Sequence, residues 1–187
     1  MFGYPYLISA HCRFLLSLTD DKTSTWIITI VTQDISIICP DLIARIHALC
    51  ECENDSIAIM ATVSAELFHA VDGYDWVGFY RVVAPNLLKI GPYQGGHGCL
   101  VIPFDRGVCG AAARQQAIQL VEDVDRFEGH IACSSRTKSE LVIPCFDQDG
   151  HLLGVLDIDS DQPNFFKWQD ADRLDQMLRQ LFQNSPS

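Results

Sequence analysis

Basic residues are scarce in this chain, and no segment gathers them into a cluster. Its 187 residues include 13 Lys and Arg against 24 Asp and Glu, which gives a formal net charge of −11 at pH 7. Proteins that bind nucleic acid neutralise its phosphates with patches of Lys and Arg. We therefore expect no nucleic-acid partner.

Long apolar runs and the pattern of a secretory leader are also missing. One of the longest apolar stretches, residues 26–31, is interrupted by Thr29 and falls far short of the roughly 20 residues that a membrane-spanning helix needs. The first residues show no basic segment followed by an apolar run and a small-residue cleavage site. The sequence therefore predicts no membrane anchor and a cytoplasmic location.

The eight cysteines do not indicate a disulfide framework, because such frameworks belong mainly to short secreted domains with small cores. With 48% apolar residues, this chain can bury the core of one ordinary domain. We predict a single catalytic domain over residues 37–187. Residues 1–36 are interpreted as an N-terminal extension of unknown role: a family-specific segment, a poorly ordered arm or a product of the assumed start of translation. We favour a dispensable segment.

Apolar spacing predicts helices first, then a run of strands, then a closing helix. Apolar residues recur at helical spacing over residues 40–49, 56–70 and 168–181. Between them, β-branched and aromatic segments favour strands. The expected strands are residues 76–83, 87–90, 100–102, 118–121, 141–144 and 152–158, with an alanine-rich helix ending near Gln116. This order predicts an α+β fold, a mainly antiparallel sheet with helices packed on it.

Three cysteines, Cys99, Cys109 and Cys133, lie in glycine-rich or polar segments and not in apolar strands. Glycine lets a loop bend and lets backbone approach a ligand, so these thiols are candidates for reaction. A buried structural role is the alternative for each of them. For Cys109 both interpretations stay open, because it begins an alanine-rich helix that could pack on the sheet, while a helix N-terminus lowers a thiol pKa.

The other cysteines are weaker candidates for a reactive thiol. Cys145 ends an apolar strand, and Cys12 and Cys39 lie in or beside the N-terminal extension, so we interpret them as core or incidental thiols. Cys50 and Cys52 form a Cys-x-Cys pair, but no second ligand pair follows at zinc-site spacing. We predict no metal.

Three carboxylates complete the candidate site. Asp157 and Asp159 alternate with Leu156 and Ile158, so in a strand both acids share one face. Glu140 begins the strand that follows Cys133. The simpler interpretation is a solvated face, but acids grouped with a reactive thiol can bind an ammonium group and supply a proton.

An aromatic wall is predicted on the first strand. Trp76 and Tyr80 are four residues apart and would share a face, whereas Phe79 would point into the core. The two rings could hold a thioether-like methyl group or a cation, or they could fill the core.

Seven short motifs occur in an order and spacing that closely resembles the free methionine-(R)-sulfoxide reductases, a branch of the GAF-domain family. The resemblance covers about residues 41–184. Its motifs are Trp76-Val77-Gly78-Phe79-Tyr80, Gly91-Pro92-Tyr93-Gln94-Gly95, Gly107-Val108-Cys109-Gly110, Glu122-Asp123-Val124, Gly129-His130-Ile131-Ala132-Cys133, Ser139-Glu140 and Gly154-Val155-Leu156-Asp157-Ile158-Asp159-Ser160.

The resemblance implies a six-stranded antiparallel GAF sheet around a small pocket. It implies that Cys133 is the catalytic cysteine, Cys99 the main resolving cysteine and Cys109 an auxiliary one. Glu140 and Asp159 would bind substrate and assist the sulfoxide oxygen. Asp157 would bind substrate, with Trp76 and Tyr80 as the aromatic pocket.

The same resemblance implies an oxidoreductase that acts on free methionine sulfoxide. Cys133 would become a sulfenic acid, condense with Cys99 to a disulfide, and be reset by thioredoxin without a bound organic cofactor or metal. It also implies a homodimer and a role in oxidative stress.

Two positions depart from the family pattern. Ser134 follows Cys133 where aspartate is common, which would ease thiolate formation, and Gly98 precedes Cys99 where alanine is usual. Two other functions also remain open: a GAF sensor that binds a small molecule without catalysis, and a thiol redox sensor or scavenger oxidised by peroxide.

Overall fold

The computed structural model describes residues 36–129 and 134–183. Within this part the chain forms an α+β domain whose six strands make one antiparallel sheet in the order β3-β2-β1-β6-β5-β4. The predicted fold class is therefore confirmed. The elements are α1 (Pro40–Leu49), α2 (Ser56–Ala70), β1 (Trp76–Ala84), β2 (Leu87–Gly95), β3 (Val101–Pro103), α3 (Gly107–Gln115), β4 (Gln119–Val121), the 3₁₀ helix η1 (Val124–Arg126), β5 (Ser139–Phe146), β6 (Leu152–Ser160) and α4 (Trp168–Phe182).

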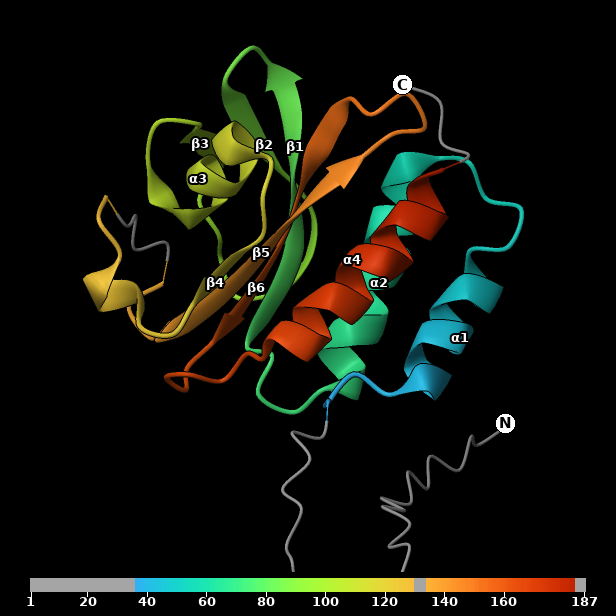
Figure 1. Cartoon of the computed structure of the whole chain (residues 1–187), viewed down its shortest axis with the longest axis horizontal. Helices are drawn as coiled ribbons and strands as arrows, with labels where there is room; N and C mark the ends of the chain where they lie inside the picture. Colours follow the sequence, from blue (N-terminus) through green and yellow to red (C-terminus); the bar gives the residue numbers. More distant parts are fainter. Residues whose placement is uncertain (1–35, 130–133, 184–187) are drawn as a thin grey trace, which may run out of the picture. The chain divides into compact units, whose positions relative to one another are not determined.

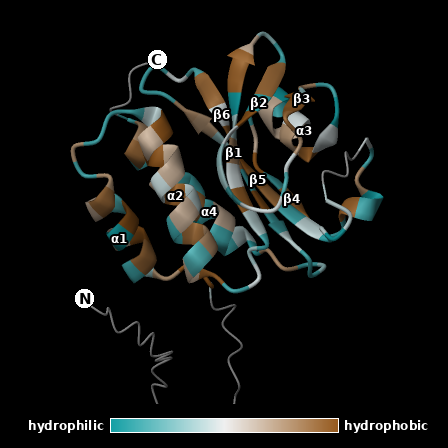
Figure 2. Ribbon diagram, turned by 180° about the vertical axis from the view of Figure 1, so that it is seen from behind, coloured by the Kyte–Doolittle hydropathy of each residue, from teal (hydrophilic) through white to brown (hydrophobic). Residues whose placement is uncertain are grey.

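The helices divide between the two faces of the sheet. Helices α2 and α4 lie against one face with α1 beside them, and the short α3 lies against the other face (Figure 1). The chain supplies local signals for these helices: Pro40 opens α1, and the Asp55 side chain accepts a hydrogen bond from the Ile57 backbone N–H at the start of α2 (2.8 Å). Both α1 and α4 carry hydrophilic and hydrophobic residues, as half-buried helices do (Figure 2).

Two separate cores follow from this arrangement, one on each face of the sheet. Strand β1 contributes to both because its side chains alternate. Phe79 lies in the core beneath α2 and α4, while Trp76 and Tyr80 lie in the core beneath α3, which confirms the predicted alternation. The candidate site residues are therefore found on the α3 face.

The N-terminal extension predicted for residues 1–36 falls outside the described residues except for Ser36, so its role stays a prediction. Across residues 36–129 and 134–183, no helix has the length and apolar character required to cross a bilayer.

Gly154→Ala is expected to lower the free energy of unfolding by about 3 kcal/mol, because overpacking a tight core forces backbone to move. Gly154 faces Arg81 across the β1–β6 pair, and an added Cβ would lie 2.3 Å from the Tyr80 carbonyl oxygen. Urea unfolding measures this change. Gly96→Ala is the control, since its Cβ would meet nothing within 4 Å. Equal stability of the two variants would contradict the argument.

Candidate active site

Three neighbouring strands bring the predicted acids together. Asp159 pairs with Glu140 of β5 on one side and with Trp76 of β1 on the other, and Asp157 pairs with Gly78. The alternation predicted along β6 is confirmed, because Leu156 and Ile158 lie in the core beneath α2 and α4. The solvated-face alternative is wrong for Asp157, which is 5% exposed, whereas Asp159 is half-buried; Glu140 is buried as well, at 6% exposure.

Cys109 joins two of these acids in a buried cluster. One donor atom from each of Cys109, Glu140 and Asp157 lies within 4.8 Å of the other two. The Cys109 thiol donates to Oε1 of Glu140 over 3.9 Å, and Oδ1 of Asp157 has no hydrogen-bond partner. The cluster is therefore close enough for its members to share protons or a ligand.

Burial decides the electrostatics of Cys109. The residue lies within α3 and is 3% exposed, and burial raises the pKa of its thiol well above the usual value, with further contributions from the charges of Asp157 and Glu140. Of the two sequence interpretations, packing against the sheet is confirmed. The helix N-terminus does not lower this pKa, because desolvation and two nearby carboxylates outweigh it.

The three carboxyl groups hold protons more tightly than ordinary acids. Burial, and then the charges of Asp157 and Asp159, raise the pKa of Glu140 well above its usual value. Burial raises the pKa of Asp157 to about 6. Burial and the charges of Asp157, Asp161 and Asp75 raise the pKa of Asp159. Groups of this kind can donate a proton near neutral pH.

An aromatic stack stands beside the acids. The rings of Trp76 and Tyr80 are stacked with centroids 5.7 Å apart, so they share a face as predicted. A third ring, Tyr93 of β2, also stacks with Trp76, with centroids 5.4 Å apart. Sequence reasoning did not assign Tyr93 to the site, although it lies in one of the quoted motifs and pairs with Gly78 on the neighbouring strand.

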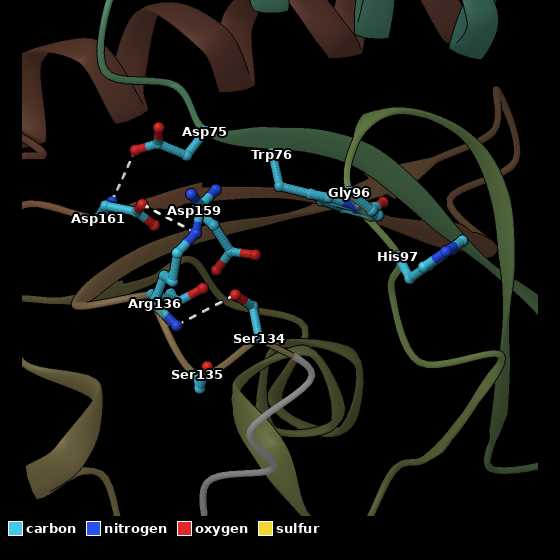
Figure 3. A pocket seen from close by; sticks show the side chains of 10 residues that line it. Asp75, Trp76, Gly96, His97, Ser134, Ser135, Arg136, Asp159 and Asp161 are labelled. Carbon is cyan, nitrogen blue, oxygen red and sulfur yellow. Dashed lines mark hydrogen bonds and ion pairs between the residues drawn. The ribbon is translucent and has the colours of Figure 1, made fainter.

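A pocket of about 380 Å³ opens beside Trp76 and Asp159 (Figure 3). Glu140, Asp157 and Tyr80 do not line it, since they are buried in the sheet face. The lining residues are Asp75, Trp76, Gly96, His97, Ser134, Ser135, Arg136, Thr137, Asp159 and Asp161.

Sequence reasoning missed the charged rim of this pocket. Nε of Arg136 lies 3.3 Å from Oδ2 of Asp161, and Oδ2 of Asp75 accepts a hydrogen bond from the Asp161 backbone N–H at 2.7 Å. Figure 3 shows both contacts, together with the Ser134 hydroxyl that accepts from the Arg136 backbone N–H. The signal was their position: Asp75 directly precedes β1, and Asp161 directly follows β6.

The predicted cysteines divide into those that the structure places and one that it does not. Cys99 packs against the core beneath α3 and is disulfide-bonded. Cys133 lies outside the described residues, so its pairing with Cys99 stays a prediction. Of the remaining thiols, Cys145 and Cys50 are buried, Cys39 and Cys52 are exposed, and Cys12 lies outside the described residues, so its interpretation stays a prediction.

Gly98, which replaces the expected alanine, lies against the aromatic stack. A Cβ at this position would lie 2.9 Å from the Tyr80 hydroxyl and 3.0 Å from Cζ2 of Trp76. The glycine therefore lets the backbone before Cys99 approach both rings more closely than an alanine would.

Several known proteins are similar to this chain in sequence and fold. Residues 34–183 match the family model of the GAF domain. GAF domain-containing protein A of Dictyostelium discoideum is 45% identical over 141 residues, covering 75% of this chain and 88% of its own length. The free methionine-R-sulfoxide reductase of Escherichia coli is 39% identical over 141 residues, covering 75% and 84%.

A solved structure shows the same similarity in sequence and fold. The free methionine-R-sulfoxide reductase of Neisseria meningitidis, determined in complex with its substrate, aligns with a TM-score of 0.71 and 40% identity over 75% of this chain and 83% of that one. These matches confirm the resemblance drawn from the motifs. The chain belongs to the GAF-domain family and, within it, to the group of the free methionine-R-sulfoxide reductases.

Proposed function

We propose that this protein reduces free methionine (R)-sulfoxide to methionine through thiol chemistry. The observation that carries the proposal is the row of Trp76, Asp159 and Glu140 across β1, β6 and β5, in which proton-holding acids stand beside stacked aromatic rings and an open pocket. Relatives named for this activity, at 39–40% identity, support it.

The reaction begins at Cys133. Its thiolate attacks the sulfur of the sulfoxide, and a carboxylic acid, Glu140 or Asp159, protonates the oxygen. The S–O bond to methionine breaks and the oxygen passes to Cys133, so methionine leaves reduced and Cys133 becomes a sulfenic acid. Since the pKa values of Glu140 and Asp159 are raised, these acids carry the proton that the step consumes.

The second half of the cycle restores the thiols. The thiol of Cys99 attacks the sulfenic acid, which forms a disulfide and releases water. A thioredoxin-type dithiol then reduces the disulfide by exchange. This chemistry requires no bound organic cofactor or metal, and we leave Cys109 as an auxiliary thiol. A homodimer, a cytoplasmic location and a role in oxidative stress belong to the same proposal.

The charges around the pocket favour a free amino acid. Such a substrate carries an α-ammonium and an α-carboxylate, both of which are lost in a peptide chain. Arg136 is the single Arg or Lys among the lining residues that the structure describes, and it stands with Asp75 and Asp161. We assign the α-carboxylate to Arg136 and the α-ammonium to the neighbouring aspartates.

Arg136→Ala is expected to raise KM for free methionine sulfoxide about 10- to 100-fold, the cost of losing an interaction with a charged group. KM for the sulfoxide of methioninamide, which lacks the carboxylate, should not change. Arg126→Ala is the matched control, because Arg126 is also exposed and paired with an aspartate, Asp123, at 3.2 Å. Equal effects of Arg136→Ala on both substrates would contradict carboxylate binding and indicate a structural role for the Asp161 pair.

The proposed activity is tested by thioredoxin-dependent NADPH oxidation with the two epimers of free methionine sulfoxide. We expect turnover of the R epimer and none of the S epimer. A parallel assay with dithiothreitol in place of thioredoxin separates the activity from the identity of the reductant. If neither reductant supports turnover by the folded, reduced protein, the enzyme proposal is wrong and a GAF sensor takes its place. Turnover of peroxide but not of sulfoxide would identify a peroxide-driven thiol protein.

A further inference from the structure

A buried thiol and two buried carboxylates converge on one point beneath α3. We propose that Cys109, Glu140 and Asp157 form a binding site for a thiophilic divalent cation such as Zn²⁺. The cation would not serve the reaction proposed above. It would replace the protons that Cys109, Glu140 and Asp157 otherwise hold, and it would act as a reversible inhibitor of the enzyme.

The spacing of the donor atoms fits a small cation. Bond lengths of about 2.3 Å to sulfur and about 2.0–2.2 Å to oxygen place the ligands of tetrahedral zinc about 3.3–3.8 Å apart. Here Sγ of Cys109 lies 3.9 Å from Oε1 of Glu140, and all three donor atoms lie within 4.8 Å of one another. Small side-chain rotations would close this gap.

An unsatisfied oxygen points to a missing partner. Asp157 is 5% exposed, yet its Oδ1 accepts no hydrogen bond. Among the described residues, no Lys, Arg or His forms an ion pair with Glu140 or Asp157. No basic side chain in the described part of the chain therefore offsets the negative charge that these two buried acids would carry when both are ionised.

The donor set selects the kind of cation. A thiolate is a soft ligand that zinc accepts and that magnesium and calcium avoid. Three protein ligands leave a fourth position for water, as in zinc sites that keep one open coordination position. On binding, the Cys109 thiol would release its proton to solvent and coordinate as the thiolate. The other convergent group, Asp147, Asp149 and His151, is different, because the Asp147 carboxylate is already satisfied by backbone N–H groups of its own turn.

Binding at this place would affect turnover, an expectation that rests on the proposed function. Glu140 is a proposed proton donor, and a cation on its carboxylate would remove the proton and block the oxygen position. We therefore expect Zn²⁺ to inhibit competitively with methionine sulfoxide and a chelator to restore full activity.

Direct binding to the fully reduced full-length protein tests the site without any assay of turnover. Co²⁺ is the spectroscopic probe: tetrahedral coordination with one thiolate gives a sulfur-to-cobalt charge-transfer band and intense visible d–d bands. Zn²⁺ is then titrated to displace Co²⁺. We expect one equivalent to bind, with loss of the charge-transfer band in both Cys109→Ala and Cys109→Ser.

Affinity identifies the ligands. Cys109→Ala and Glu140→Gln should each weaken Zn²⁺ binding by more than the roughly 10- to 100-fold that loss of an outer-shell partner costs. Cys145→Ala is the matched control, since Cys145 is also buried but stands outside the acid cluster. The proposal would be overturned if Cys109→Ala kept both the Zn²⁺ affinity and the charge-transfer band of the wild-type protein. It would also be overturned if the wild-type protein bound no cation. Neither result bears on the reductase activity, which is measured in its own assay.

Discussion

Cys133→Ser is expected to abolish turnover of free methionine (R)-sulfoxide, lowering kcat by at least about 10³-fold, because a neutral serine hydroxyl replaces the attacking thiolate. Serine also cannot form the sulfenic acid or the disulfide on which the second half of the cycle depends. The measurement is single-turnover formation of methionine by the pre-reduced protein, which reports the first step without thioredoxin.

The control is Cys39→Ser, since Cys39 is exposed beside α1 and distant in sequence from every proposed site residue. It should retain full activity. The informative contrary result is an active Cys133→Ser together with an inactive Cys109→Ala. That result would move the nucleophile to Cys109, despite the high pKa that burial imposes on its thiol.

Glu140→Gln is expected to lower kcat/KM about 10²- to 10⁴-fold, the range found when a positioned general acid is removed. Glutamine keeps the shape of the side chain and can donate a hydrogen bond, but it has no proton to transfer. The pH profile gives the sharper test. A general acid must be protonated, so wild-type activity should fall as pH rises through the raised pKa of Glu140, and this basic limb should be altered or absent in the variant.

Glu51→Gln serves as the charge-matched control, because Glu51 is exposed after α1 and should leave both constants unchanged. If Glu140→Gln raised KM but kept kcat and the basic limb, Glu140 would be a binding residue only. Asp159 would then be the acid to test next, since it pairs with Glu140 across the strands and its pKa is also raised.

Periodicity in the sequence was enough to predict the fold and the faces of the strands. A strand has only two faces, so the positions of Trp76 and Tyr80, and of Asp157 and Asp159, followed from their even spacing. The helices were equally readable, because Pro40 and Asp55 mark helix starts through purely local chemistry. These features depend on residues close together in the chain.

The features that the sequence did not reveal depend on residues far apart in the chain. The pKa of Cys109 was ambiguous because a helix terminus and burial act in opposite directions, and the depth of burial is set by the packing of α3 on the sheet. Arg136 and Asp75 meet through Asp161, and no periodic pattern connects these three loops. Tyr93 joined the aromatic stack through strand pairing that spacing alone does not give.

The row of Trp76, Asp159 and Glu140 restricts which insertions and deletions this sequence can accept during evolution. The same pairing that aligns these residues also turns Leu156 and Ile158 into the opposite core. Inserting or deleting one residue within β6 would reverse every later side chain in the strand, so chemistry and folding would fail together. The turn at residues 147–151 lies outside this alternation but sets the register of β5 on β6 through the Asp147 carboxylate, so length variation among descendants of this protein should spare both the strand and this turn.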